Sequence, residues 1–353
     1  MKKAVLTIAL LLALAGIGGF VLVSRVDETY RGYPGEFQDV SIPSGASPRA
    51  IGQQLVDAGV IRDDLTYRLT LLMTDQARHL KAGEFRFDRP MTPREVVDKV
   101  ARGEFDLVSI TFREGLTIGE MATVFETQGL GTADAFKAAA KDASLIKDID
   151  PAADDLEGYL FPDTYPVSRH IDATGLVKKM VDRFAKALSP ELLAAAHAKG
   201  YSVRQLVTLA SIVEKETGAS VERPLVAAVY TNRLKIGMGL QCDPTVIYAL
   251  QRAGKYDGNI RKDDLGYDSP YNTYKYAGLP PGPIAAPGLS SLEAAAHPDE
   301  TVDYLFFVSK NDGTHAFAHS LDEHNRNVQK YQVQFFKDKR LAAQRDAAAA
   351  HAH

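Results

Sequence analysis

Two glutamates flank a lysine near the end of an apolar segment, in the stretch SIVEKETGAS at residues 211–220. A partly buried glutamate is a candidate general acid, because loss of solvent raises the pKa of a carboxyl and keeps it protonated near neutral pH. Apolar residues at helical spacing predict a helix over residues 202–217, opened by Ser202. At about 100° per residue, Glu214 and Glu216 fall on opposite borders of the apolar stripe, each about 80° from its centre. The pattern indicates two candidates, and a solvated, charged helix end is the alternative.

The segments after this helix predict further elements around it. Gly218 is placed to end the helix in a left-handed conformation, and Ser220 to open a second helix over about residues 220–236. A stretch rich in Gly, Pro, Asn and Tyr at residues 267–288 is too irregular for a helix, and a loop of this length is usually functional. An Asn-Asp-Gly turn then predicts a hairpin, followed by a helix from about Leu321.

Nearer the N-terminus, a short alternating strand followed by a turn and a capped helix recurs at residues 40–55, 85–100 and 110–125. Thr92 precedes Glu95, and Thr117 precedes Glu120, at the Thr-x-x-Glu spacing of a capping box. Such pieces predict a small two-layer module. The segment 39–103 resembles the LysM glycan-binding pattern, and a packing or spacer role is the alternative.

The first residues predict a membrane anchor. An uncharged run spans residues 4–23, between the lysines of MKK and Arg25, and about 20 helical residues are enough to cross a bilayer. We expect residues 1–3 in the cytoplasm and a polar linker over residues 24–38. The alternative is a cleaved signal peptide, with Ala-Leu-Ala at residues 13–15 as the cleavage site.

Composition excludes several classes of function. The net charge of -4 gives no general attraction for nucleic acid, and nucleic acid is not predicted as a partner. Cys242 is the one cysteine, so no intramolecular disulfide is possible. Dinucleotide and nucleoside-triphosphate motifs are absent from the sequence. The stretch LEGYLFPDTYPVS at residues 156–168 joins aromatic and acidic side chains in a way that suits sugar binding, with core packing as the alternative.

Several stretches together closely resemble the YceG-like family of endolytic murein transglycosylases: LASIVEKET, VYTNRLKIGMGLQCDPTVIY, SPYNTYKYAGLPPGPIAAPG, YLFFVSKNDGTHAFAHSLDEHN and LEGYLFPDTY. The match covers nearly the whole chain. In that family the second glutamate of the Glu-x-Glu pair is the catalytic acid, and this position is Glu216. Cys242 occupies a slot that is often Thr in relatives, which makes it a poor candidate for a role.

The resemblance implies a lytic transglycosylase that needs no cofactor and no metal. Such an enzyme cleaves the bond between N-acetylmuramic acid and N-acetylglucosamine and leaves a 1,6-anhydro end. Gln241 and Asn272 are the first choices for glycan contacts within the matching stretches. Further candidates are Asn232, Tyr274, Asp243 and Glu157, although Asp243 also suits a helix N-cap.

The expected architecture is α+β: an N-terminal transmembrane helix, a LysM-like βα module over residues 39–108, a larger mixed α/β catalytic domain over residues 109–340 and a flexible tail over residues 341–353. We expect a single-pass protein of the inner membrane with its catalytic domain in the periplasm. The resemblance also implies action on nascent peptidoglycan near its synthases.

Three rival hypotheses remain open on the sequence. One is a membrane-anchored peptidoglycan-binding protein without activity. A second is a cytosolic lyase using pyridoxal phosphate, with Lys215 as the Schiff base, against which stand the predicted anchor and the lack of a recognisable phosphate-binding loop before a helix. A third is a zinc site formed by His315, His319 and His324, which the sequence disfavours because no metalloprotease-like spacing is present.

Overall fold

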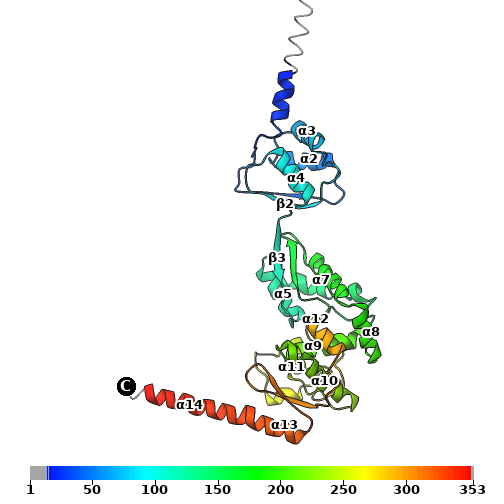
Figure 1. Ribbon diagram of the computed structural model, residues 1–353, viewed down its shortest axis with the longest axis vertical. Helices are drawn as coiled ribbons and strands as arrows, with labels where there is room; N and C mark the ends of the chain where they lie inside the picture. Colours follow the sequence, from blue (N-terminus) through cyan, green and yellow to red (C-terminus); the bar gives the residue numbers. More distant parts are fainter. Residues whose placement is uncertain (1–13, 15, 351–353) are drawn as a thin grey trace, which may run out of the picture. The chain divides into compact units, whose positions relative to one another are not determined.

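The computed structural model describes residue 14 and residues 16–350 of the chain (Figure 1). The chain divides into two compact units. Unit 1 comprises Met1–Ser109 and Pro166–His170, and unit 2 comprises Ile110–Tyr165 and Ile171–His353. The predicted mixture of helices with short strands is confirmed. The division after Ser109 falls beside the predicted boundary between residues 39–108 and 109–340, but it also assigns a returning segment to unit 1 that the sequence did not indicate.

Unit 1 is a small layer of helices on a two-stranded sheet. Strands β1 (Gln38–Ile42) and β2 (Gly83–Phe87) pair in antiparallel register, from Gln38 opposite Phe87 to Ile42 opposite Gly83. The helices that pack with this sheet are α2 (Pro48–Asp57), α3 (Asp64–Thr74) and α4 (Pro93–Arg102). The predicted capping box at the start of α4 is present, since Thr92 and Glu95 exchange backbone and side-chain hydrogen bonds. One apolar core joins these elements, with Tyr67, Phe85 and Val96 fully buried.

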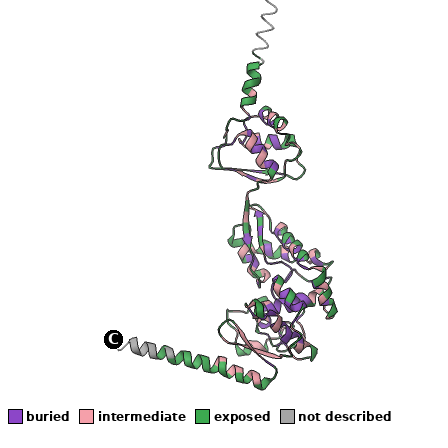
Figure 2. Ribbon diagram, viewed as in Figure 1, coloured by how far each residue is buried: buried purple, intermediate pink, exposed green. Residues whose placement is uncertain are grey.

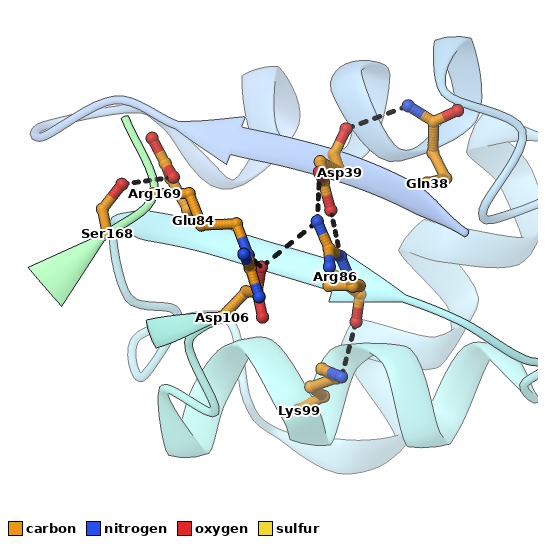
Figure 3. Close-up of polar contacts among 8 residues, drawn as sticks. All are labelled: Gln38, Asp39, Glu84, Arg86, Lys99, Asp106, Ser168 and Arg169. Carbon is orange, nitrogen blue, oxygen red and sulfur yellow. Dashed lines mark hydrogen bonds and ion pairs between the residues drawn. The ribbon is translucent and has the colours of Figure 1, made fainter. Parts of the chain in front are cut away.

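A polar network holds the returning segment of unit 1 (Figure 3). Arg86 on β2 forms a bidentate ion pair with Asp39 on β1, with both N–O distances 2.8 Å. Asp106 forms ion pairs with Arg86 at 3.4 Å and with Arg169 at 3.1 Å. Ser168 also hydrogen-bonds to Glu84. Residues far apart in the sequence are thus joined by charge-assisted hydrogen bonds.

Strands β3 (Leu107–Thr111) and β4 (Thr164–Ser168) form a second two-stranded sheet, and each runs from one unit into the other. Unit 2 is otherwise mostly helical. Its helical elements are α5 (Ile118–Thr127), α6 (Ala133–Ala140), η1 (Ala143–Ile146), α7 (Ala173–Ala187), α8 (Pro190–Ala198), α9 (Val203–Glu216), η2 (Ser220–Glu222), α10 (Arg223–Lys235), α11 (Asp243–Arg252), η3 (Lys262–Gly266), α12 (Leu289–Ala296), α13 (Leu321–Val328), η4 (Gln329–Gln334) and α14 (Phe335–Ala350). The predicted hairpin is β5 (Phe306–Ser309) with β6 (His315–Ala318).

Helix α9 is the centre of unit 2. It packs against α8, α10, α11 and α12, and every residue from Leu206 to Val213 is buried (Figure 2). Ser202 caps it in a box with Gln205, as the sequence indicates. Because the helix is covered on all sides, a single apolar stripe does not describe it. This is why the helical wheel could not separate Glu214 from Glu216.

Three local predictions need correction. Gly218 does not take a left-handed conformation: α9 ends because Thr217 is extended, with φ -135° and ψ 129°. The second helix does not start at Ser220, since the turn η2 precedes α10 and Pro224 occupies the first turn of α10. The tail expected to fray from residue 341 continues as helix α14 to Ala350, and residues 351–353 lie outside the described residues.

Much of the expected anchor lies outside the described residues. Within the segment 4–23, residues 4–13 and 15 lie outside the described residues. Residues 16–24 are helical. Among the helices that the structure describes, none combines the length and apolar character needed to cross a bilayer.

The core of unit 1 predicts a local loss of stability for Phe85→Ala. Removal of this fully buried ring should cost about 3–5 kcal/mol. Hydrogen exchange measured on peptides from residues 38–103 should show faster opening throughout unit 1. Phe37→Ala, which removes a half-exposed ring that lies under Arg86, is the control. Equal effects of the two substitutions would contradict the assignment of this core.

Candidate active site

Glu216 is the last residue of α9, and its carboxyl has two hydrogen-bond donors. The Tyr230 hydroxyl on α10 donates to Oε1 at 2.7 Å, and the Cys242 thiol donates to the same oxygen at 3.0 Å. Tyr230 is in turn held by Phe307 of β5, with ring centres 5.9 Å apart at 90°. Three separate elements therefore fix this one side chain.

Burial raises the pKa of Glu216 above its ordinary value. The nearby charge of Asp243 raises it further, whereas the hydrogen bonds from Cys242 and Tyr230 and the charge of His315 lower it. The C-terminal end of a helix is also the negative end of its dipole, which disfavours a carboxylate there. The net result is an acid that keeps its proton at higher pH than a solvated glutamate does.

Glu216 opens into a cavity of about 320 Å³. The walls come from α10, the start of α11, the long loop after η3, β5 and the start of α13. The lining residues are Glu216, Tyr230, Arg233, Gln241, Asp243, Tyr274, Phe306, Phe307, Leu321 and His324. The cavity is large enough for part of an oligosaccharide and combines aromatic rings with a few polar groups, as small-molecule sites do.

Four predicted site residues meet in this cavity: Glu216, Gln241, Asp243 and Tyr274. Gln241 has a left-handed backbone with φ 50°, a strained conformation for a residue with a side chain. This turn leaves Gln241 exposed and Cys242 buried at the start of α11. Asp243 is not the N-cap of α11; its Oδ1 instead accepts a 2.6 Å hydrogen bond from the Tyr274 hydroxyl.

Glu214 has a structural environment. Its Oε1 accepts from Arg223 at 2.9 Å, and its Oε2 accepts from the Gly288 amide at 3.0 Å and the Ser291 hydroxyl at 2.7 Å. The ion pair is buried, since the side chains of Glu214 and Arg223 are only 6% and 9% exposed. With these donors in place, Glu214 connects α9 to α10 and to the start of α12, and it does not line the cavity.

The two asparagines among the predicted glycan contacts point into the protein. Asn272 is fully buried, and its amide donates to the carbonyls of Leu265 and Tyr267 at 2.9 and 2.8 Å while its Oδ1 accepts from the Tyr274 amide. Asn232 donates to two backbone carbonyls near β5. These contacts do not favour a direct sugar contact for either residue, and Asn272 instead shapes the loop that carries Tyr274.

Glu157 lies away from Glu216, beside a separate cavity of about 410 Å³ that Tyr248 and Arg252 also line. Its carboxylate oxygens accept from the amide of Ile118 at the start of α5, at 3.1 and 3.4 Å. Burial and the charge of Asp155 raise the pKa of Glu157 to about 8. Its predicted role as a substrate contact stays a prediction, and it does not share the Glu216 cavity.

The remaining candidates also receive a place. His315 pairs with Glu222 at 2.7 Å, and His319 contacts Asp303. Within the described part of the chain, no group of three or more potential ligands is arranged for a metal ion. The Lys215 amine donates to the Gly115 carbonyl, and Lys215 is not among the residues that line the cavity.

The two donors to Glu216 are not evident from the sequence. Cys242 occupies a variable position there, and Tyr230 by itself carries no signal of a role. Both lie far from Glu216 along the chain, so helical periodicity could not reveal the contact. The one available signal was that both residues belong to the stretch VYTNRLKIGMGLQCDPTVIY that carries part of the resemblance.

Comparisons with known proteins match nearly the whole chain. The profile of the YceG-like family matches residues 40–330. An endolytic murein transglycosylase of Bacillus subtilis is 34% identical over 83% of this chain and 84% of its own length. A protein of the same name from Streptococcus pneumoniae is 30% identical over 93% of this chain, and the match spans 65% of that relative. The crystal structure of a YceG-like protein from Listeria monocytogenes has a TM-score of 0.56 at 32% identity, covering 82% of this chain and 98% of the other.

The matches across the chain define the class of protein as an enzyme of the lytic transglycosylase type. The chain belongs to the YceG-like family. The predictions of this family and of an enzyme of the lytic transglycosylase class are both confirmed.

The different environments of the two glutamates predict opposite effects on stability. Glu214→Gln leaves Arg223 without its buried partner and should destabilise the protein by about 3–5 kcal/mol. Glu216→Gln removes a carboxyl whose charge is disfavoured by burial, so its stability should equal or exceed that of the wild type. Thermal unfolding at neutral pH measures both. A larger loss for Glu216→Gln would reverse the assignment of roles.

The raised pKa of Glu157 predicts a stability that falls with pH. Between the ordinary value of 4.5 and about 8, the folded state keeps a proton that the unfolded state releases. The stabilisation is therefore complete at low pH and is lost as pH rises through about 8. Glu157→Gln removes this dependence. Urea denaturation from pH 5 to pH 9 should show that the free energy of unfolding of the variant increases relative to that of the wild type as pH rises. The same pH dependence in both proteins would contradict the raised pKa of Glu157.

Proposed function

We propose that this protein cleaves the β-1,4 bond between N-acetylmuramic acid and N-acetylglucosamine within peptidoglycan strands and leaves 1,6-anhydro ends. The observation that carries the proposal is the environment of Glu216. Among the residues that line the cavity of about 320 Å³, Glu216 is the one glutamate, and burial raises its pKa. Membership of a family whose curated relatives are named endolytic murein transglycosylases supports the same substrate.

Glu216 would act first as an acid and then as a base. Protonated Glu216 donates its proton to the glycosidic oxygen, and the bond from that oxygen to the anomeric carbon breaks. The resulting carboxylate takes the proton of the 6-hydroxyl of the same muramic acid as O6 bonds to the anomeric carbon. The proton lost in the first step is regained in the second, and no water is consumed.

The other groups in the cavity suit a sugar that develops positive charge. Asp243 is placed to stabilise that charge, with its carboxylate oriented by the Tyr274 hydroxyl. Gln241 is exposed at the cavity and offers both a donor and an acceptor to sugar hydroxyls. Phe306 and Phe307 line the same space with rings that can cover the apolar face of a pyranose. The loop that carries Tyr274 supplies part of a wall that limits the entry of water.

The remaining units fit the same proposal. We assign residues 4–23 as a single-pass anchor in the inner membrane, residues 1–3 to the cytoplasm and the chain after the anchor to the periplasm, where peptidoglycan lies. Residues 39–108, with strands β1 and β2 and helices α2, α3 and α4, would be a LysM-like module that holds a glycan strand. Work on nascent strands beside peptidoglycan synthases follows from the family resemblance.

The test is Glu216→Gln in the full-length protein, incubated with isolated peptidoglycan and followed by mass spectrometry of the products. Wild type should release strands with anhydro ends, and the variant should lose at least about 100-fold in rate. Glu191→Gln, an exposed glutamate on α8, is the matched control and should retain activity.

Each other outcome has a meaning. Reducing muramic acid ends would make the protein a hydrolase with Asp243 as the second carboxylate. Full activity of Glu216→Gln would remove Glu216 as the acid. Strand binding without cleavage by the wild type would leave a non-catalytic binding protein.

A further inference from the structure

Both hydrogen-bond donors to Glu216 reach the same oxygen atom. Tyr230 and Cys242 donate to Oε1 at 2.7 and 3.0 Å. Within the described part of the chain, Oε2 accepts no hydrogen bond, and it is not among the buried side-chain atoms that lack a partner. Oε2 is therefore the oxygen that remains open to the cavity. The two oxygens of one carboxyl thus have different surroundings.

Tyr230 and Cys242 are suited to act as permanent donors. Burial raises the pKa of the Tyr230 hydroxyl and of the Cys242 thiol well above their ordinary values, and the adjacent Glu216 charge raises both further. Neither group gives up its proton at neutral pH, so each offers a hydrogen and Oε1 must accept it. An oxygen that accepts two hydrogen bonds is a poor place for the carboxyl proton.

We propose that Tyr230 and Cys242 are positioning residues that keep Oε1 of Glu216 as an acceptor and so confine the transferable proton to Oε2. This inference rests on the proposed function, because it concerns the proton that Glu216 exchanges with the substrate. The acid then presents its proton in one direction. The same oxygen recovers a proton from the 6-hydroxyl in the second step, while Oε1 stays bound to its two donors throughout.

The two donors also stabilise the intermediate state of Glu216. After the proton leaves Oε2, the carboxylate is buried and costly. Hydrogen bonds to a charged acceptor are stronger than those to a neutral one, so Tyr230 and Cys242 strengthen their hold as the charge forms. They favour the carboxylate that must exist between the two proton transfers.

Other charged or titratable groups face Glu216 from every surrounding element. They are Arg233 on α10, Asp243 on α11, Tyr274 on the loop, His315 on β6 with its partner Glu222, and His324 on α13. None of them hydrogen-bonds to the carboxyl. Removal of Tyr230 or Cys242 as a donor therefore shifts the pKa of Glu216 while these surrounding charges stay the same.

The experiment is the pH dependence of kcat/KM for strand cleavage by full-length Tyr230→Phe, Cys242→Ala and Cys242→Ser. Activity needs the protonated acid, so it falls as pH rises through the pKa of Glu216. Loss of a donor that favours the carboxylate moves this alkaline limb upward, by about one pH unit for Tyr230→Phe. Cys242→Ala should shift it less, since a thiol is a weaker donor. Cys242→Ser keeps a donor and should return the limb to the wild-type position.

Tyr165→Phe is the matched control, because Tyr165 is a buried tyrosine whose hydroxyl donates to the Phe161 carbonyl away from the cavity. Its alkaline limb should match that of the wild type. Thermal unfolding confirms that each variant is folded. If Tyr230→Phe does not fold, the comparison of Cys242→Ala with Cys242→Ser tests the inference by itself.

Two failures are distinguishable. Lower activity with an unmoved alkaline limb in both Tyr230→Phe and Cys242→Ala would mean that the two residues only pack the site, and the inference would be overturned while Glu216 stays the acid. An active Glu216→Gln would instead overturn the proposed function on which the inference rests.

Discussion

The removal of the Glu216 carboxyl from water is the constraint on which the rest of the site depends. A carboxyl at the end of a buried helix loses hydration and lies at the negative end of the helix dipole. Both effects favour the neutral acid. The proposed role as a proton donor at neutral pH requires that the neutral acid is favoured. The proposed second role, as a base, requires that the charged carboxylate keeps some stabilisation as well. The hydrogen bonds from Tyr230 and Cys242 supply that second requirement, so the environment of Glu216 balances two protonation states.

Two glutamates only two residues apart illustrate how neighbours in a sequence acquire different functions. Glu214 accepts from Arg223, Gly288 and Ser291, and these donors use both of its oxygens. Glu216 has donors at one oxygen only and lines the cavity. A buried charge with a full set of partners fixes α9, α10 and α12 together, whereas an incompletely satisfied carboxyl remains available for chemistry. Glu214 thus stabilises the packing of the helices around the cavity that Glu216 lines.

The sequence predicted local features well and long-range contacts poorly. Ser202 and Thr92 were identified as caps because capping depends on residues three positions apart. The choice between Glu214 and Glu216 did not follow from periodicity, because α9 is buried on all sides; only the family resemblance indicated Glu216. Asn272 was chosen as a glycan contact because it lies in a stretch that carries the family resemblance, and its amide donates to the carbonyls of Leu265 and Tyr267. Such pairings depend on tertiary packing that no spacing rule contains.

The second carboxylate of the cavity bears on which reaction the site favours. A hydrolase needs its second carboxylate free to activate water or to attack the sugar. Asp243 is not free in this sense, because its Oδ1 accepts a 2.6 Å hydrogen bond from the Tyr274 hydroxyl. A carboxylate that already accepts a hydrogen bond can still stabilise positive charge on the sugar ring, because that interaction is electrostatic and needs no proton transfer. The arrangement is compatible with the proposed division of roles, in which Glu216 exchanges the proton, Asp243 stabilises the charge and an internal hydroxyl takes the place of water.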